Sequence, residues 1–198
     1  MKKTIGSVGC ALCAGSLFAT TYYWVANDPG SQTWADAIDV TNWSTAWDDT
    51  THAPNSSAHP AGLPTSSDTL WLCRDILLDL KGQSWTVGTY RDGKWERLND
   101  GKEYYGAANH TFGVTNGTLS LTGSPTFRTA GGVVVESGGA LNLAMPILDY
   151  GVPVTVRNGG VLTVSILQGN RGGITVEPGG SMTLNQLSLW SYAGAYTT

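Results

Sequence analysis

A short pattern recurs four times between residues 113 and 184, and it limits the possible folds more than any other feature. Each copy has an alternating apolar segment, a turn that contains glycine and a second alternating segment. The glycines that close the turns are Gly117, Gly139, Gly160 and Gly180, at spacings of 22, 21 and 20 residues. A fixed period of this size is typical of repeat architectures. Because glycine permits the positive φ that a tight corner requires, we expect these residues to form the corners.

The alternating segments have a period of two residues, which predicts β-strands. No helical period appears between residues 68 and 190, so the helices that usually connect parallel strands are not expected. Strands that recur about every 20 residues without such helices fit a chain that stacks on itself. The predicted fold class is all-β, as a single-stranded parallel β-helix, or β-solenoid.

Alignment of the repeats predicts inward columns of apolar side chains and outward columns that are mostly polar. An earlier copy over residues 76–87 follows the same plan with one residue fewer. The predicted inward columns are Val133, Val154 and Ile174; Val135, Val156 and Val176; Leu119, Leu141, Leu162 and Met182; and Leu121, Leu143, Val164 and Leu184. The predicted outward residues are Ser120, Asn142, Thr155, Thr163, Thr175 and Thr183.

Residues 1–19 have the features of a secretory signal peptide. Lys2 and Lys3 precede an apolar run from Ile5 to Phe18, and Ala19 offers a small residue for cleavage. The run is shorter than the roughly 20 residues that a transmembrane helix needs, and no second run of that length follows. We therefore expect a secreted or bacterial cell-surface protein (outer membrane or extracellular), with no membrane-spanning segment in the mature chain.

Charge and cysteine content exclude several classes of partner and cross-link. The chain has 11 basic and 15 acidic residues, a net charge of −4, and no basic cluster, which argues against nucleic acid as a partner. Of the 3 cysteines, only Cys73 follows the signal peptide, so no disulfide within the mature chain is expected. Cys73 itself is interpreted as a small buried side chain rather than a reactive thiol, since no positive group lies beside it in the sequence.

Residues 20–67 differ from the repeats, because they are rich in tryptophan and in small polar residues. Tyr23-Trp24, Thr33-Trp34 and Asn42-Trp43-Ser44 precede a loop from Pro64 to Asp68 and then a strand. This pattern, followed by Gly-Gly repeats, resembles autotransporter-type passenger domains and pectin-lyase-like β-helix surface proteins. The resemblance implies a right-handed β-helix. Because the end of a solenoid exposes a strand edge and tryptophans bury a large area, we expect these tryptophans to cap the first rung, in preference to forming a sugar-stacking platform.

The predicted organisation has four parts: a signal peptide over 1–19, a tryptophan-rich cap over 20–67, a β-solenoid over 68–190 and a tail over 191–198. A hairpin insertion is expected at about 88–111, with a tight Asp-Gly turn in Tyr90–Trp95. Proteins of this kind usually continue for many more rungs to an outer-membrane or sorting segment. We therefore expect either a short free-standing member or an incomplete reading frame. The tip near residues 185–190 is expected to be covered by another chain, including by self-association, or by further sequence.

Four residues are candidates for a binding site. Glu136, Arg157 and Glu177 occupy the same place in successive repeats and should stack on the outer face, while Trp95 lies in the insertion, where solenoids often bind partners. The column has two interpretations: an exposed ion-pair ladder, which we prefer, or part of a catalytic groove. No catalytic motif is present, the histidines His52, His59 and His110 match no zinc template and are expected in solvated loops, and no cofactor is expected.

The predicted function is a non-enzymatic structural or adhesive module that contacts glycans or other surface proteins. Its outward Thr, Asn and Ser side chains suit many weak hydrogen bonds. The alternative is a pectin-lyase-like carbohydrate-active enzyme, either a polysaccharide lyase or a glycoside hydrolase. Such an enzyme needs several carboxylates that converge in a groove, whereas the 15 acidic residues of this chain are widely spread. Fold class by itself does not separate the two.

Overall fold

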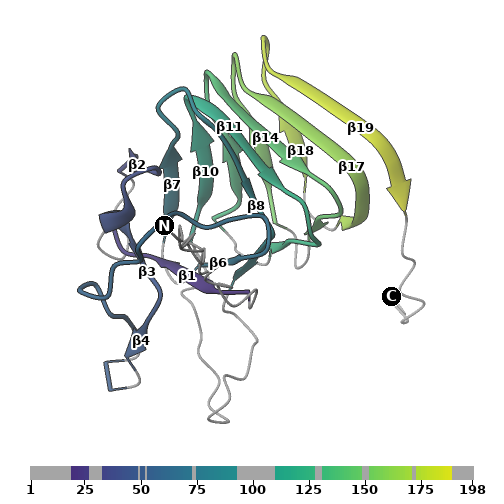
Figure 1. The fold of residues 1–198 in the computed structure, drawn as a ribbon. Helices are drawn as coiled ribbons and strands as arrows, with labels where there is room; N and C mark the ends of the chain where they lie inside the picture. The colour runs from purple at the N-terminus through teal and green to yellow at the C-terminus, as the bar shows by residue number, and fades with distance from the viewer. Residues whose placement is uncertain are drawn as a thin grey trace, which may run out of the picture.

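The computed structural model describes residues 19–26, 33–48, 50–51, 53–72, 75–92, 110–127, 131–148, 152–170 and 173–188. These residues form an all-β structure, as predicted, and within them the only helix is a single 3-10 turn, η1 (Val40–Asn42). Most of the strands lie in parallel sheets. Figure 1 shows the strands of successive repeats side by side, running from teal through green to yellow.

Each repeat contributes strands to three parallel ladders, which we call A, B and C. Ladder A is the six-stranded sheet and takes the first alternating segment of each repeat. Its strands are, in order, β2 (Ala35–Asp36), β7 (Ile76–Asp79), β10 (Phe112–Thr115), β13 (Val133–Val135), β16 (Val154–Val156) and β18 (Ile174–Val176). Neighbouring strands of ladder A all pair in parallel.

Ladder B takes the second alternating segment of each repeat and is also parallel throughout. Its strands are β8 (Ser84–Val87), β11 (Gly117–Leu121), β14 (Gly139–Leu143), the first part of β17 (Val161–Asn170) and β19 (Ser181–Ser188). In Figure 1 ladder B lies in front of ladder A, and β19 forms its outer edge.

Ladder C is a third set of strands that the alignment of the repeats does not predict. Its strands are β3 (Trp43–Ser44), β1 (Thr21–Trp24), β6 (Thr69–Leu72), β9 (Thr89–Asp92), β12 (Thr126–Phe127), β15 (Ile147–Leu148) and the second parts of β17 and β19. All of its pairs are parallel except that β3 is antiparallel to β1. Because β17 pairs with both β14 and β15, ladders B and C form one eleven-stranded sheet.

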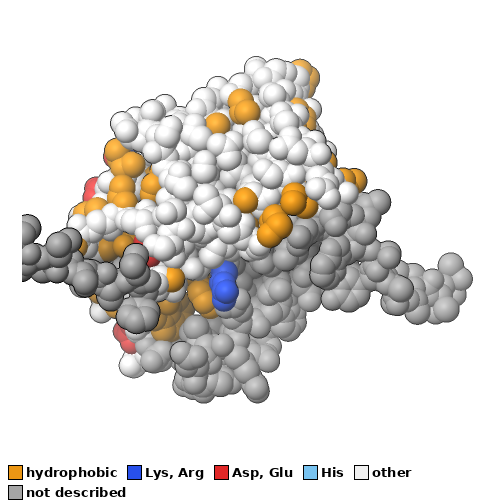
Figure 2. Space-filling view, turned by 45° about the vertical axis from the view of Figure 1, so that its right-hand side comes forward, with side chains coloured by type: hydrophobic (Ala, Val, Ile, Leu, Met, Phe, Trp, Pro, Cys, Tyr) orange, Lys and Arg blue, Asp and Glu red, His pale blue; other side chains and the backbone are white. Residues whose placement is uncertain are grey.

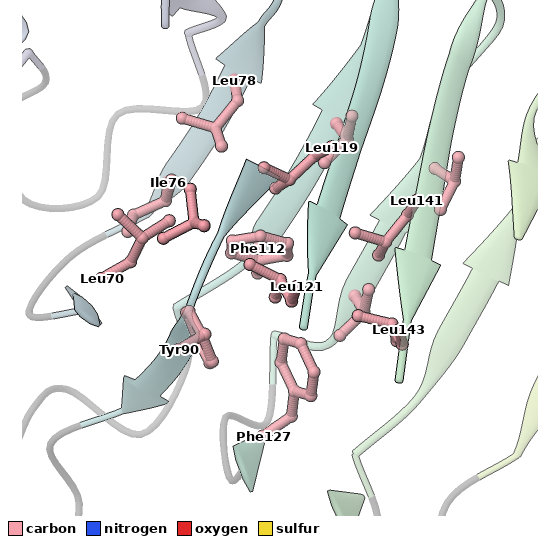
Figure 3. Close-up of a cluster of buried hydrophobic side chains, with 14 of the residues drawn as sticks. Leu70, Ile76, Leu78, Tyr90, Phe112, Leu119, Leu121, Phe127, Leu141 and Leu143 are labelled. Atoms are coloured by element: carbon pink, nitrogen blue, oxygen red, sulfur yellow. The ribbon is translucent and has the colours of Figure 1, made fainter. Parts of the chain in front are cut away.

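The predicted columns of inward apolar side chains are confirmed by the register of ladders A and B. The earlier repeat extends each column, since Ile76 pairs with Phe112, Leu78 with Val114, Trp85 with Leu119 and Val87 with Leu121. These residues are buried and form one hydrophobic core. Figure 3 shows this core, with side chains of all three ladders directed toward one another. Ladder C adds Tyr90 and Phe127, whose rings stack at 4.5 Å between centroids.

The two glycines of each Gly-Gly turn have different tasks, which corrects the expectation that the second one supplies the positive φ. The left-handed residue is the first glycine, with φ of +73° at Gly138, +77° at Gly159 and +86° at Gly179. The second glycine lies against the preceding repeat: a Cβ at Gly139 or Gly160 would be 2.5 Å from a backbone carbonyl oxygen. The second position is therefore restricted by space rather than by φ.

The N-terminal segment packs onto the first repeat. Trp24 and Trp43 are fully buried, and the Trp43 ring contacts both the Trp24 ring and the ring of Trp85 in β8. The short antiparallel pair β4 (Trp47–Asp48) and β5 (Ala53–Pro54) follows β3. Pro64 accepts a hydrogen bond of 2.8 Å from the Trp85 indole N–H, which ties this segment to ladder B.

Several predicted features lie wholly or largely outside the described residues: the signal peptide apart from Ala19, Cys73, and the tail over 191–198. The expected hairpin at Tyr90–Trp95 begins within β9, so Tyr90 and Arg91 belong to ladder C, and residues 93–109 of the insertion are not described. Within the described part of the chain, no helix is long and apolar enough to cross a membrane.

Candidate functional site

The structure brings Glu136, Arg157 and Glu177 together in one column. Each follows directly after a strand of ladder A, at the corner that leads to ladder B. The backbone N–H of each residue donates a 2.9 Å hydrogen bond to a carbonyl of the preceding repeat, which holds the three residues in register. Stacking was therefore predictable from the repeat alone.

The side chains of this column form two ion pairs. Arg157 Nε lies 3.7 Å from Glu136 Oε1, and Arg157 Nη1 lies 2.5 Å from Glu177 Oε1. The three side chains are 33–47% exposed, so such pairs contribute about 0.2–1 kcal/mol each. A general acid or base must exchange a proton with substrate, whereas here each carboxylate lies against the same guanidinium. The geometry favours the ion-pair ladder over a catalytic groove.

A second charged cluster occupies the same corner in the first repeat, and the sequence analysis missed it. Lys81 Nζ lies 2.6 Å from Asp79 Oδ2, and Asn116 Nδ2 donates to Asp79 Oδ1 at 3.1 Å. Burial raises the pKa of Asp79, but hydrogen bonds from Lys81 and Asn116 outweigh it and hold that pKa below its ordinary value. Lys81 and Asn116 both have φ of 50°, so this cluster also braces two left-handed corners. In the sequence, this cluster could have been predicted from an acidic and a basic residue, Asp79 and Lys81, that lie two positions apart at a turn.

Of the remaining candidates, only His59 and His110 lie within the described residues. Trp95 lies outside the described residues, as does His52. His59 is exposed, with Nδ1 3.1 Å from the Trp43 carbonyl oxygen. His110 is buried rather than solvated, which corrects the expectation, because it lies two residues before the core strand β10. The described ranges contain no group of three or more His, Cys, Asp or Glu residues that could hold a metal ion.

The outer surface of ladder B is a larger feature, and its residues carry no charge. Figure 2 turns the right-hand side of Figure 1 forward, and there the described surface shows few charged side chains. We call this the uncharged surface, and it consists of Ser84, Thr86, Thr118, Ser120, Ala140, Asn142, Val161, Thr163, Ser181 and Thr183. These residues alternate with the inward columns, so they point away from the core.

The uncharged surface is regular in two directions. One column contains Thr86, Ser120, Asn142, Thr163 and Thr183, and the other contains the remaining five residues. Strands in a ladder are about 4.8 Å apart, so hydroxyl and amide groups recur at that interval along the first column. In the second column Ala140 and Val161 interrupt the polar groups. Asn142 Nδ2 donates to Ser120 Oγ at 3.1 Å, which shows that adjacent repeats are within hydrogen-bond reach. A neutral, extended ligand with repeated hydroxyl groups could bind here without desolvating a charge.

Sequence reasoning identified part of this surface. Ser120, Asn142, Thr163 and Thr183 were predicted to point outward, and their register confirms the expected columns. The sequence also carried a signal that was not used: the segments 84–87, 117–121, 139–143, 161–164 and 181–184 contain no Asp, Glu, Lys or Arg. Among the described residues of the repeats, Asp79, Lys81, Glu136, Arg157 and Glu177 lie instead at the corner between ladders A and B, and Arg91 and Asp92 lie in ladder C. Comparison of the chain with models of protein families, with curated proteins and with solved structures gives no significant match.

Proposed function

We propose that the chain is a right-handed parallel β-helix that serves as a non-enzymatic structural and adhesive module of the bacterial cell surface or of secreted material. The uncharged surface is its binding face, and its ligand is a neutral glycan or the glycan-bearing surface of another protein. Trp95, in the insertion, is proposed as an additional contact, since an indole ring can pack on the apolar face of a sugar.

Support for the β-helix comes from the order in which the chain passes through the ladders. Each complete repeat enters ladder A, then B, then C, and returns to A beside its previous strand. The right hand is proposed from the chirality of parallel β-connections and from the resemblance to autotransporter-type and pectin-lyase-like proteins. The buried tryptophans Trp24 and Trp43 support the proposal that the N-terminal segment caps this coil.

The observation that carries the adhesive function is the regular arrangement of neutral polar groups over five strands of ladder B. Exposed Ser, Thr and Asn side chains both donate and accept hydrogen bonds, as sugar hydroxyl groups do. Each contact is weak, but a repeated ligand can make many of them together. A flat sheet that repeats its contacts is better suited to an extended ligand than to a small metabolite, whose sites are concave.

The test is a binding assay with insoluble polysaccharides and mucin glycans. It measures how much of the protein the insoluble material removes from solution. Thr163→Lys places a charge in the middle of the uncharged surface and should reduce binding at least about tenfold. Thr155→Lys is the matched control, because it changes an outward threonine of the neighbouring ladder A strand β16. Equal binding by both variants and the unchanged chain would contradict the uncharged surface as the binding face. Trp95→Ala measures the separate contribution of the insertion.

The alternative, a carbohydrate-active enzyme, makes a different prediction. Incubation with pectin, alginate and mucin glycans should release no shorter products if the module is non-enzymatic. Product release that is lost in Glu136→Gln would support an enzyme instead. Cell fractionation tests the proposed location: the chain should be found at the cell surface or in the medium and not in the cytoplasm.

A further inference from the structure

The C-terminal end of the ladders is formed by the outer edges of β18 and β19, and no other described strand pairs with either edge. β19 has eight residues, none of which is charged or proline. Edge strands of soluble proteins are usually protected by charge, proline, bulges or short length, because their free N–H and C=O groups pair with other chains. The edge of β19 contains no charged residue and no proline, and it is long. It is therefore suited to pairing with another strand.

The side chains at this end are core residues without a covering layer. Leu184 is 37% exposed, Leu187 is 49% exposed and Val176 is 41% exposed. Their partners in the preceding repeat, Val164, Leu167 and Val156, are at most 2% exposed. A further layer of β-structure placed on β18 and β19 would therefore bury apolar surface and satisfy backbone groups at the same time.

A second copy of the chain can supply that layer through its own C-terminal end. At the N-terminal end Trp43 is fully buried and the antiparallel strand β3 closes ladder C. Charge also permits the contact. Although the whole chain carries −4, the only charged residue in β18, β19 and the turn between them is Glu177, which is paired with Arg157. Two identical surfaces that meet form an isologous interface about a twofold axis.

We propose that two copies of the chain associate through these end surfaces, with β19 antiparallel to β19 of the second copy and Thr183 on the twofold axis. This inference does not depend on the proposed glycan binding. In this register Met182 of each copy lies opposite Leu184 of the other, on the inward face. Ser181 lies opposite Asn185, on the outward face. Moving the axis to Leu184 would place Met182 opposite Gln186, so apolar and polar side chains would be mismatched.

The first experiment measures the oligomeric state of the full chain by sedimentation over a wide range of concentrations. The expected result is a reversible dimer, and Leu184→Lys should weaken it at least about tenfold because a charge would enter the interface. Thr163→Lys is the matched control, since it adds the same charge one strand inside the edge and should leave the dimer unchanged. Circular dichroism confirms that each variant keeps its β-structure. A monomer at all concentrations, or open-ended growth beyond a dimer, would overturn the proposal.

The second experiment tests the register by disulfide trapping in a chain with Cys10, Cys13 and Cys73 changed to serine. In the proposed register the two Thr183 Cα atoms are about 4.5–5.5 Å apart, within the range that a disulfide spans. Thr183→Cys should therefore cross-link two copies under mild oxidation. The two Asn185 positions would be about 13 Å apart, four residue steps along the strand, so Asn185→Cys should not cross-link. Trapping through Asn185→Cys, or through neither variant, would overturn this register.

Discussion

At the N-terminal end of the ladders one inward column is covered by a tryptophan side chain, whereas at the C-terminal end the inward columns finish in residues that are partly buried or exposed. Trp43 contacts Trp85, which begins the column that continues through Leu119, Leu141 and Leu162. That column ends in Met182, which is only partly buried. The repeat units are alike in both places, so the difference comes from what lies beyond them.

This difference shows that a repeat of this kind does not complete its own core. Each repeat buries its inward side chains against the repeats before and after it, as expected for stacked repeats. At one end, Trp24 and Trp43 are fully buried against the first repeat, and such aromatic side chains bury about 150–250 Å² each. At the other end the described residues offer no equivalent. The two ends should therefore respond differently to the same kind of substitution.

The largest effect is expected from Trp43→Ala at the covered end. Trp43 is fully buried, contacts the rings of Trp24 and Trp85, and donates a 3.0 Å hydrogen bond to the Ala37 carbonyl. Its removal should lower the free energy of unfolding by about 3–5 kcal/mol, measured by urea denaturation. Trp71→Ala is the control, because Trp71 is partly exposed on ladder C. Similar losses for both variants would contradict a special role for Trp43 at this end.

The next largest effect is expected from a substitution in the middle of one inward column, compared with the same kind of substitution at its end. Leu162→Ala should lower the free energy of unfolding by about 2–5 kcal/mol, because Leu162 is 1% exposed between two repeats. Met182→Ala, one repeat further on, should cost less than half as much, since no strand among the described residues lies on one side of Met182. Both are measured by urea denaturation at low protein concentration. Equal losses would mean that Met182 is covered in solution.

The parts of the fold that depend on the repeat period could be predicted from the sequence. Leu119, Leu141 and Leu162 fall into one column because each segment alternates and the turns keep a nearly constant spacing. The same logic placed Glu136, Arg157 and Glu177 side by side. These inferences need only local periodicity and one assumption, that successive repeats stack in parallel.

Other parts depend on contacts that no local pattern records. Ladder C escaped prediction because β12 and β15 have only two residues each and follow loops of variable length. The restriction at Gly160 comes from the Val135 carbonyl of another repeat, so the sequence of the turn alone could not separate the two glycines. Trp34 is a third case: it lies over Gly113, where a Cβ would be 2.7 Å from the Trp34 ring. The sequence shows that the strands of the uncharged surface contain no charged residues, but only the register of the sheet shows that these strands are adjacent.

A pH-dependent effect is expected at the covered end, where Asp68 ties the N-terminal segment to the ladders. Asp68 accepts hydrogen bonds from the Thr20 N–H at 2.8 Å and from the Thr65 N–H and hydroxyl, both at 2.7 Å. Burial raises the pKa of Asp68, but these hydrogen bonds outweigh it and hold the pKa below its ordinary value. A carboxylate with a lowered pKa stabilises the fold above its unfolded pKa of about 3.9, and that contribution is lost as the pH falls through the folded pKa.

Asp68→Asn should therefore lower the free energy of unfolding by about 1.5–3 kcal/mol at neutral pH, because an amide nitrogen would face N–H donors. Below about pH 4 the difference between the variant and the unchanged chain should shrink. Urea denaturation at several pH values measures both. Asp39→Asn is the control, since Asp39 is an exposed cap of η1 that makes hydrogen bonds only within its own loop. A difference that is independent of pH would contradict the role of the Asp68 charge.

The smallest effect is expected near the open end, at the exposed ion pairs of Arg157. Arg157→Gln removes both pairs and should lower the free energy of unfolding by less than about 2 kcal/mol. Arg157→Glu goes further, because it stacks three carboxylates at the spacing of adjacent strands, and it should lower the melting temperature more than Arg157→Gln does. Since these groups are exposed, added salt should reduce the difference between the two variants. Thermal denaturation at low and high salt measures it. Identical melting temperatures for both variants at low salt would mean that Glu136 and Glu177 do not stay beside position 157 in solution, and that backbone pairing alone sets the register of the last two repeats.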